Sequence, residues 1–286
     1  MSGAADSKAQ KGTTPVDVTY QEFLRVLASG PEIAQSYENL LTSLELLSSG
    51  RPLKSLLVTG TQPHEGTTTV AVNLALTAAL AGKRVLILDA DFRTPQLHRI
   101  FQLENERGLA DILTSRGASE AVIQTVSISA PEHGPQGSLN VVTTGGTVSA
   151  SVLPAIRTPE FAKSLQTLVA DYDLALVDTS PLLTAGDALL FAAAVDGVIL
   201  VLNAGTTAER EAALAKERLR QAGGNVLGVV LNRFDEKTHG SSLYPYSSSA
   251  SALPSPAHGA YRPRLAGDDR PDPQRRLLRR RTTGEA

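Results

Sequence analysis

Residues 56–82 constrain the fold more than any other part of the chain. They run from a short apolar segment through a polar turn into a long apolar helix that ends before Gly82. A buried strand, a turn of small residues and a helix form the opening unit of a parallel sheet. The first N–H groups of a helix have no partner within it, so such a turn attracts anions, and phosphate is the natural occupant. The helix is expected to bury a single stripe, formed by Val70, Leu74, Ala78 and Ala81, and to end with Gly82 as its C′ residue.

The turn matches the phosphate-binding pattern G-x-x-x-x-G-K-[ST] only in part. Aligned on Gly66 and Thr68, the pattern places Thr61 at its first glycine and Thr67 at its lysine, while Gly60 lies one residue too early. Thr68 retains the hydroxyl that binds Mg²⁺, but the lysine is absent. This motif alone leaves two readings open, a nucleotide site and an ordinary strand–loop–helix unit with a threonine-rich cap.

Strand and helix patterns alternate along the rest of the chain. Apolar runs predict further strands at residues 84–88, 139–143, 174–177, 197–202 and 226–231. Helical spacing predicts helices at 31–47, in pieces within 96–115, and at 158–170, 187–194 and 208–221. Thr158 and Pro159 are expected to start the helix of 158–170, with Phe161, Leu165 and Leu168 facing inward. The alternation indicates an α/β fold, a doubly wound, mostly parallel sheet with helices on both faces.

The polar clusters suited to chemistry all follow predicted strands. They are residues 66–68, Asp89, Asp91, Asp178 and Asn232. In open parallel sheets, ligands bind outside the carboxyl ends of the strands, at the point where the strand order reverses. Core residues chosen independently would not align in this way, so the pattern favours the nucleotide site.

Composition limits the remaining possibilities. The chain has no cysteine, which excludes a disulfide scaffold and thiolate metal sites. No apolar leader and no membrane-length apolar run is apparent, so a cytoplasmic location is expected. We divide the chain into a disordered N-terminus at 1–16, one domain at 17–236 and a flexible, arginine-rich tail at 237–286.

The tail differs in charge from the body. After Gly240 it carries eight arginines and four acidic residues, a net charge of +4 against −6 for the rest. It is either a solvated tail or a weak contact with anionic membrane. The fold offers no recognition helix and no basic stripe, so no specific nucleic-acid partner is expected.

Taken together, the motifs resemble those of the bacterial tyrosine kinases, polysaccharide autokinases related to the MinD/ParA ATPases. Residues 61–70 resemble their Walker A segment, and 85–93 their acidic motif D-x-D-x-R. Residues 174–181 resemble the D-T-P-P ending, with Ser180 replacing one proline, and 196–201 and 228–232 fit later strands. The resemblance spans 31–235 and implies a P-loop NTPase fold of the MinD/ParA type.

The resemblance also implies roles for individual residues, with ATP and Mg²⁺ as ligands. Asp89 and Asp91 would act around Mg²⁺ and the attacking phenol, with Arg93 beside them. The implied metal ligands are Thr68, Asp89 and Asp178, the last through water. The implied nucleotide contacts are Gly66, Thr67, Thr68, Thr69, Asn232 and Arg233. From the residues alone, Asp89 and Asp91 could equally be a helix cap and a turn, and Asp178 a turn residue.

By the same resemblance, the chain would be an ATP-dependent tyrosine autokinase that regulates capsule or exopolysaccharide biosynthesis and export. Tyr244, Tyr246 and Tyr261 would be its phosphoacceptors, although solvated tail residues are an equal reading. A membrane co-polymerase would supply the activator segment and hold the protein at the inner face of the membrane.

Three departures from the family pattern leave alternatives open. Thr67 replaces the lysine, and the tyrosine cluster is thin. The assembly motif E-x-x-R-x-x-R appears as Gln35, Glu38 and Leu41, so self-association is expected to stop at a monomer or dimer. Lys54 and Lys83 precede their strands, which leaves Arg93 as the better-placed compensating cation. The rival functions are a nucleotide-binding pseudoenzyme of the export machinery and a MinD/ParA-like positioning ATPase.

Overall fold

The computed structural model describes residues 19–48, 50, 52–114, 122–130, 134–146 and 152–234. The predicted segments 1–16 and 237–286, with the tail tyrosines, lie outside the described residues. Seven strands form one sheet: β1 Ser55–Gly60, β2 Val85–Ala90, β3 Gln124–Ala130, β4 Gly134–Val142, β5 Leu174–Thr179, β6 Gly197–Asn203 and β7 Val226–Asn232. The helices within the described ranges are α1 Tyr20–Ser29, α2 Pro31–Leu47, α3 Thr67–Leu80, α4 Leu97–Ile100, α5 Leu109–Thr114, α6 Val152–Ala155, α7 Pro159–Val169, α8 Asp187–Ala192 and α9 Glu209–Gln221.

The strand order is β3-β4-β2-β5-β1-β6-β7, and every pairing is parallel except that of β3 with β4. From β1 the chain crosses to β2 on one side, whereas β6 and β7 extend the sheet on the other. The order therefore reverses at β1, and a ligand is expected at the carboxyl end of that strand. The predicted doubly wound, mostly parallel sheet is confirmed.

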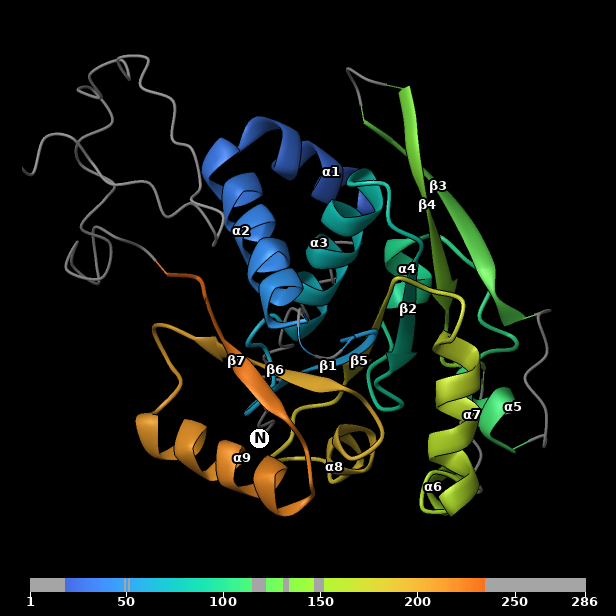
Figure 1. Ribbon diagram of the computed structural model, residues 1–286, viewed down its shortest axis with the longest axis vertical. Coiled ribbons are helices and arrows are strands. Elements are labelled where there is room, and N and C mark those ends of the chain that lie inside the picture. Colours follow the sequence, from blue (N-terminus) through green and yellow to red (C-terminus); the bar gives the residue numbers. More distant parts are fainter. Residues whose placement is uncertain are drawn as a thin grey trace, which may run out of the picture. The chain divides into compact units, whose positions relative to one another are not determined.

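Helices cover both faces of the sheet (Figure 1). One face carries α1, α2 and α3, and the other carries α7, α8 and α9. The two hydrophobic clusters use alternate residues of the same strands, as the two-residue period of a strand requires. Leu56 and Val58 face the first cluster, whereas Leu57 faces the second.

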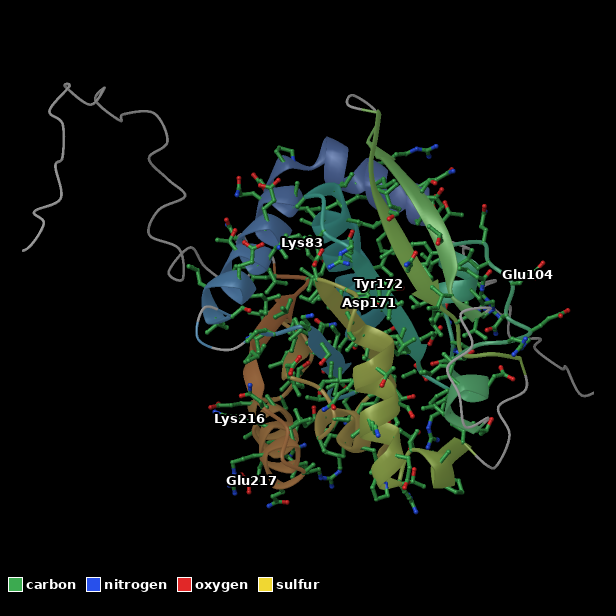
Figure 2. All side chains as sticks on the ribbon, turned by 45° about the vertical axis from the view of Figure 1, so that its right-hand side comes forward. Lys83, Glu104, Asp171, Tyr172, Lys216 and Glu217 are labelled. Atoms are coloured by element: carbon green, nitrogen blue, oxygen red, sulfur yellow. The ribbon has the colours of Figure 1, made fainter. Side chains whose placement is uncertain are left out.

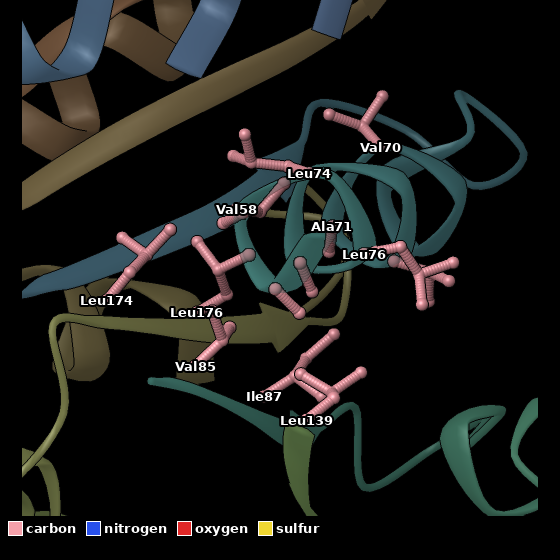
Figure 3. Packing of buried hydrophobic residues seen from close by; sticks show 14 of the residues in the cluster. Val58, Val70, Ala71, Leu74, Leu76, Val85, Ile87, Leu139, Leu174 and Leu176 are labelled. Atoms are coloured by element: carbon pink, nitrogen blue, oxygen red, sulfur yellow. The ribbon is translucent and has the colours of Figure 1, made fainter. Parts of the chain in front are cut away.

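Helix α3 differs from its prediction. The expected single stripe is wrong, because residues 70–79 of α3 are all buried. Helices α1 and α2 pack over the outer side of α3 while its inner side contacts the sheet. Figure 3 shows Val70 and Leu74 of α3 with Val58 and Leu176 of the sheet in this packing. Each such side chain contributes roughly 1.5–3 kcal/mol by leaving water.

Most other expected elements are present within a few residues of their predicted bounds. Gly82 takes the left-handed conformation (φ 81°), and the N–H of Lys83 donates to the Ala78 carbonyl at 3.1 Å, so the C′ prediction is confirmed. Thr158 is the N-cap of α7 and Pro159 its first residue, as predicted. Three elements were not predicted, α1, α6 and the antiparallel strand β3, and β4 begins at Gly134 rather than at 139.

Candidate nucleotide site

The turn between β1 and α3 forms an anion cradle at the centre of the sheet. Gly66 precedes the helix in the left-handed conformation (φ 88°), which glycine adopts without strain. A Cβ at this position would also collide with the Asn232 amide. The N–H groups of Thr67, Thr68 and Thr69 begin the helix and have no partner within it. Backbone geometry thus supplies the phosphate-binding feature that the sequence predicted.

Thr68 lies against a buried aspartate at the end of β5. Its hydroxyl donates a hydrogen bond to Asp178, whose side chain is 1% exposed. The other carboxylate oxygen of Asp178, Oδ1, has no hydrogen-bond partner among the described residues. Burial, reinforced by the charge of Asp89, raises the pKa of Asp178 well above its usual value. A buried carboxylate oxygen without a donor calls for a cation.

Asp89 ends β2 directly opposite Asp178, because the two residues are paired in the register of β2 with β5. Its carboxylate is fully buried and accepts the N–H groups of Asp91 at 3.2 Å, Gln96 at 3.1 Å and Leu97 at 3.0 Å. Burial raises the pKa of Asp89 to about 7, although the N–H donors act against it. Asp89 therefore caps the start of α4 while it faces the loop.

Asp91 is held by a local network. Its Oδ1 accepts the N–H of Arg93 at 3.1 Å, the N–H of Thr94 at 3.0 Å and the hydroxyl of Ser180 at 2.5 Å. Its Oδ2 accepts the Thr94 hydroxyl at 2.8 Å. Ser180 replaces a proline of the family motif, so this link between the two acidic motifs depends on that departure. The turn role that the residues alone allowed is thus present, and the catalytic role stays a prediction.

The remaining predicted contacts surround the loop. Asn232, at the end of β7, donates from Nδ2 to the Glu65 carbonyl at 2.8 Å and accepts the N–H of Arg233 at 3.0 Å. The side-chain amide of Asn232 thus holds the loop in place through a hydrogen bond. Arg93 and Thr69 are exposed, and Arg233 takes a left-handed conformation with φ 56°. Whether these side chains touch a nucleotide stays a prediction.

One buried residue of the loop was not predicted. The carboxylate of Glu65 is 3% exposed and accepts hydrogen bonds from Thr61, Gln62 and Thr207. A glutamate in a polar turn normally faces solvent, so composition gave no signal for it. The position of Gly60, one residue before the pattern requires a glycine, was the available hint.

The lysines that the sequence analysis placed at the far end of the sheet lie there. Lys83 precedes β2 and pairs with Glu45 at 2.6 Å; Figure 2 labels Lys83, together with Tyr172, which precedes β5. The ammonium of Lys54 donates to the Ala170 carbonyl at 3.0 Å. Neither side chain compensates for the missing lysine at Thr67.

The acidic residues fit magnesium only through a small ligand set. Within the described ranges, no three His, Cys, Asp or Glu side chains gather as a metal site. Mg²⁺, however, usually takes one or two carboxylates and fills its octahedron with phosphate oxygens and water. Thr68 and the unpartnered oxygen of Asp178 match that requirement. Asp89 lies next to them, but its oxygens already accept backbone N–H groups.

The fold and this site define a P-loop type nucleotide-binding domain. The chain belongs to the CobQ/CobB/MinD/ParA nucleotide-binding domain family, whose model matches residues 56–254. Within that family it groups with the bacterial tyrosine-protein kinases.

Two curated relatives and one solved structure illustrate the similarity. Tyrosine-protein kinase YwqD of Bacillus subtilis is 34% identical over 199 residues, which are 70% of this chain and 80% of the relative. A putative tyrosine-protein kinase, CapB of Staphylococcus aureus, is 31% identical over 75% of this chain and 90% of its own length. The kinase domain of the Escherichia coli tyrosine kinase ETK superposes with a TM-score of 0.65 at 28% identity, covering 80% of this chain and 87% of that domain.

In the part of the chain that the structure describes, no helix is both long enough and apolar enough to cross a membrane.

Proposed function

We propose that the protein is an ATP- and Mg²⁺-dependent protein-tyrosine kinase that phosphorylates its own tail. The observation that carries the proposal is the unpartnered, buried oxygen of Asp178 beside the Thr68 hydroxyl and the loop N–H groups. Anion donors after β1 and a cation-seeking carboxylate at the end of the neighbouring strand β5 are the two halves of a magnesium–phosphate site. Tyrosine-kinase relatives at 34% and 31% identity support the choice of phosphoacceptor.

The chain's own residues would divide the work. Backbone N–H groups at residues 66–69 would hold the phosphates, and Thr68 with Asp178 would hold Mg²⁺, which screens the phosphate charge when bound. Arg93, exposed past the end of β2, would supply positive charge toward the transferred group. Asp91 would orient the phenol. In the transfer, the phenol oxygen bonds to the γ-phosphorus, the bond to the β-phosphate oxygen breaks, and the phenolic proton passes to a carboxylate.

The biological setting follows from the family resemblance. Tyr244 and Tyr246 would be the phosphoacceptors, and a membrane co-polymerase of capsule or exopolysaccharide export would activate the kinase at the inner face of the membrane. Glu38 is exposed on α2, whereas Leu41 is buried against the core. The family's charged assembly face is therefore not reproduced, and we expect a monomer or dimer. Light scattering that reports a large closed oligomer would contradict this expectation.

A second function is favoured by one observation, the threonine at the lysine position. Without that cation the protein could hold MgADP yet transfer phosphate slowly, and regulate export by its nucleotide state. Phosphotyrosine mass spectrometry of the expressed protein, compared with Asp91→Asn, separates the two. Tail phosphotyrosine that disappears in Asp91→Asn supports the kinase. MgADP binding by calorimetry without phosphotyrosine supports the regulatory module, and no nucleotide binding at millimolar concentration removes both.

A further inference from the structure

The carboxylate of Glu65 connects three segments of the site. Its Oε2 accepts the N–H of Thr61 at 2.5 Å and that of Gln62 at 3.1 Å. Its Oε1 accepts the hydroxyl of Thr61 at 2.6 Å and that of Thr207 at 2.5 Å. Thr207 belongs to the segment between β6 and α9, far from the phosphate loop in sequence. A single side chain thus holds the start of the loop and a second segment.

The carboxylate of Glu65 is the acceptor in this network. The N–H groups of Thr61 and Gln62 can only donate, and both donate to Oε2. The hydroxyls of Thr61 and Thr207 donate to Oε1, and that of Thr207 also accepts the N–H of Asn203 at 2.9 Å. A glutamine could keep its carbonyl oxygen on the two N–H groups and turn its NH₂ group toward the hydroxyls, which can rotate to accept it.

Gly60 makes room for this carboxylate. A Cβ at Gly60 would lie 2.6 Å from Glu65 Oε2 and 2.9 Å from the Thr67 hydroxyl. The glycine that stands one residue too early for the phosphate-binding pattern therefore has a function. It lets the Glu65 carboxylate reach the end of β1.

The backbone of Glu65 adds a third attachment. Its carbonyl accepts the Asn232 amide at 2.8 Å from the end of β7. Residue 65 is thus fastened by its side chain to the segment before α9 and by its carbonyl to β7. In the sheet, β6 and β7 lie on one side of β1, whereas β5 and β2, which carry Asp178 and Asp89, lie on the other. Glu65 therefore connects the loop to the side of the sheet away from the two aspartates.

We infer that Glu65 is a positioning residue that locks the phosphate loop to the segments that follow β6 and β7. By the family resemblance Asn232, which ends β7, and Arg233 would border the adenine, so we call this the base side of the site. The inference rests on the proposed nucleotide binding for its effect on ligands, but the lock itself exists without ligand. The carboxylate does not use the N–H groups of Thr67, Thr68 and Thr69, so the helix end stays available for phosphate. In a loop without a lysine, this internal hydrogen-bond acceptor fixes the loop shape.

The first arm of the test needs no ligand. Amide hydrogen exchange is measured by NMR for the full chain, for Glu65→Ala and for Thr207→Val. Glu65→Ala is expected to speed exchange at Thr61 and Gln62 about tenfold or more, because these N–H groups lose their acceptor. Thr207→Val should speed exchange at Asn203, and the control Thr207→Ser should not. Unchanged exchange at Thr61 and Gln62 in Glu65→Ala would overturn the inference.

The second arm compares MgADP with magnesium pyrophosphate by calorimetry. Pyrophosphate has no base, so uncoupling the loop from the base side should weaken MgADP several-fold more than pyrophosphate. Thr207→Val leaves the charge of the site unchanged and should shift the affinity ratio in the same direction as Glu65→Ala. Equal losses for both ligands would indicate general loosening and overturn the positioning role. If the unmodified protein binds neither ligand, the proposed function fails, and the exchange arm alone decides the lock.

Discussion

Asp89 and Asp178 face each other across neighbouring parallel strands, and both are buried with raised pKa values. Two carboxylates placed this way resist ionisation together, because each raises the energy of the other's charged form. The hydroxyl of Thr68 donates to Asp178, but a hydroxyl carries no positive charge. A bound cation would therefore stabilise the ionised form of the pair.

The ligand-free protein should lose stability as the pH rises. The pKa of Asp89 is about 7 in the folded state against an ordinary 3.8, so the folded state keeps a proton that the unfolded state has released. The contribution of Asp89 to stability is therefore complete below about pH 4 and is lost as the pH rises through about 7. Thermal unfolding from pH 5 to 8 measures this effect.

Asp178→Asn provides the matched variant for that measurement. It should raise the unfolding midpoint at pH 8 by a few degrees, since about 1 kcal/mol moves the midpoint of such a domain by roughly 2–4 °C. At pH 5, where Asp89 is largely protonated, the gain should be smaller. A gain that is the same at both pH values would show that charge is not its cause.

Nucleotide binding should depend strictly on Mg²⁺. Glu65, Asp89, Asp91 and Asp178 bring four carboxyl groups to the loop, and no lysine follows Gly66. Free ADP would bring its own negative charge to this acidic site, and Mg²⁺ offsets that charge when it is bound. We expect the affinity for ADP to fall by about 100-fold or more when the metal is chelated, equivalent to roughly 2.7 kcal/mol. Calorimetry with and without EDTA tests this, and equal affinities would refute the proposed metal role of Asp178.

Thr67→Lys should increase tail phosphotyrosine. The increase should be smaller than the same lysine would give in a loop that has no carboxyl group beside it. The Thr67 hydroxyl and Glu65 Oε2 approach the same point above Gly60, so the new lysine side chain begins beside a carboxyl group that can attract its ammonium. We expect an increase of about three- to tenfold by quantitative phosphotyrosine mass spectrometry. The control is Thr67→Met, which matches the length without the charge. An equal effect of both variants would assign the gain to packing.

Arg93→Ala tests the compensating cation. If Arg93 supplies the charge at the transferred phosphate, the variant should reduce phosphotyrosine about 100-fold while MgADP affinity changes little. Arg99→Ala, at another exposed arginine on the nearby helix α4, is the control and should leave the signal unchanged. Phosphotyrosine that survives Arg93→Ala would require a cation from a partner.

The sheet was predictable because its inner strands are continuous apolar runs, and burial on both faces leaves no other use for such runs. Helix α1 was missed although Thr19 and Glu22 form a capping box, a signal that was present in the sequence. Strand β3 was missed because its alternating Ser and Thr residues lie at an edge, where little apolar character is needed.

The strand-end aspartates were predictable for the same reason as the strands, since each follows an apolar run. The lock of Glu65 was not, because it depends on Thr207, 142 residues away, and on the register that brings β6 beside β1. Likewise, nothing in the sequence shows that Ser180 reaches Asp91. Long-range polar contacts are decided by topology and are read only from the folded chain.

The burial of residues 70–79 of α3 has a consequence for how the site moves. A helix enclosed by the sheet on one side and by α1 and α2 on the other cannot detach locally without opening the whole core. The amides of residues 70–79 should exchange only through cooperative global unfolding, and the phosphate cradle is continuous with this slowest unit. Ligand bound at the cradle then adds its full binding free energy to the stability of the domain, so a melting curve becomes a direct titration of the site.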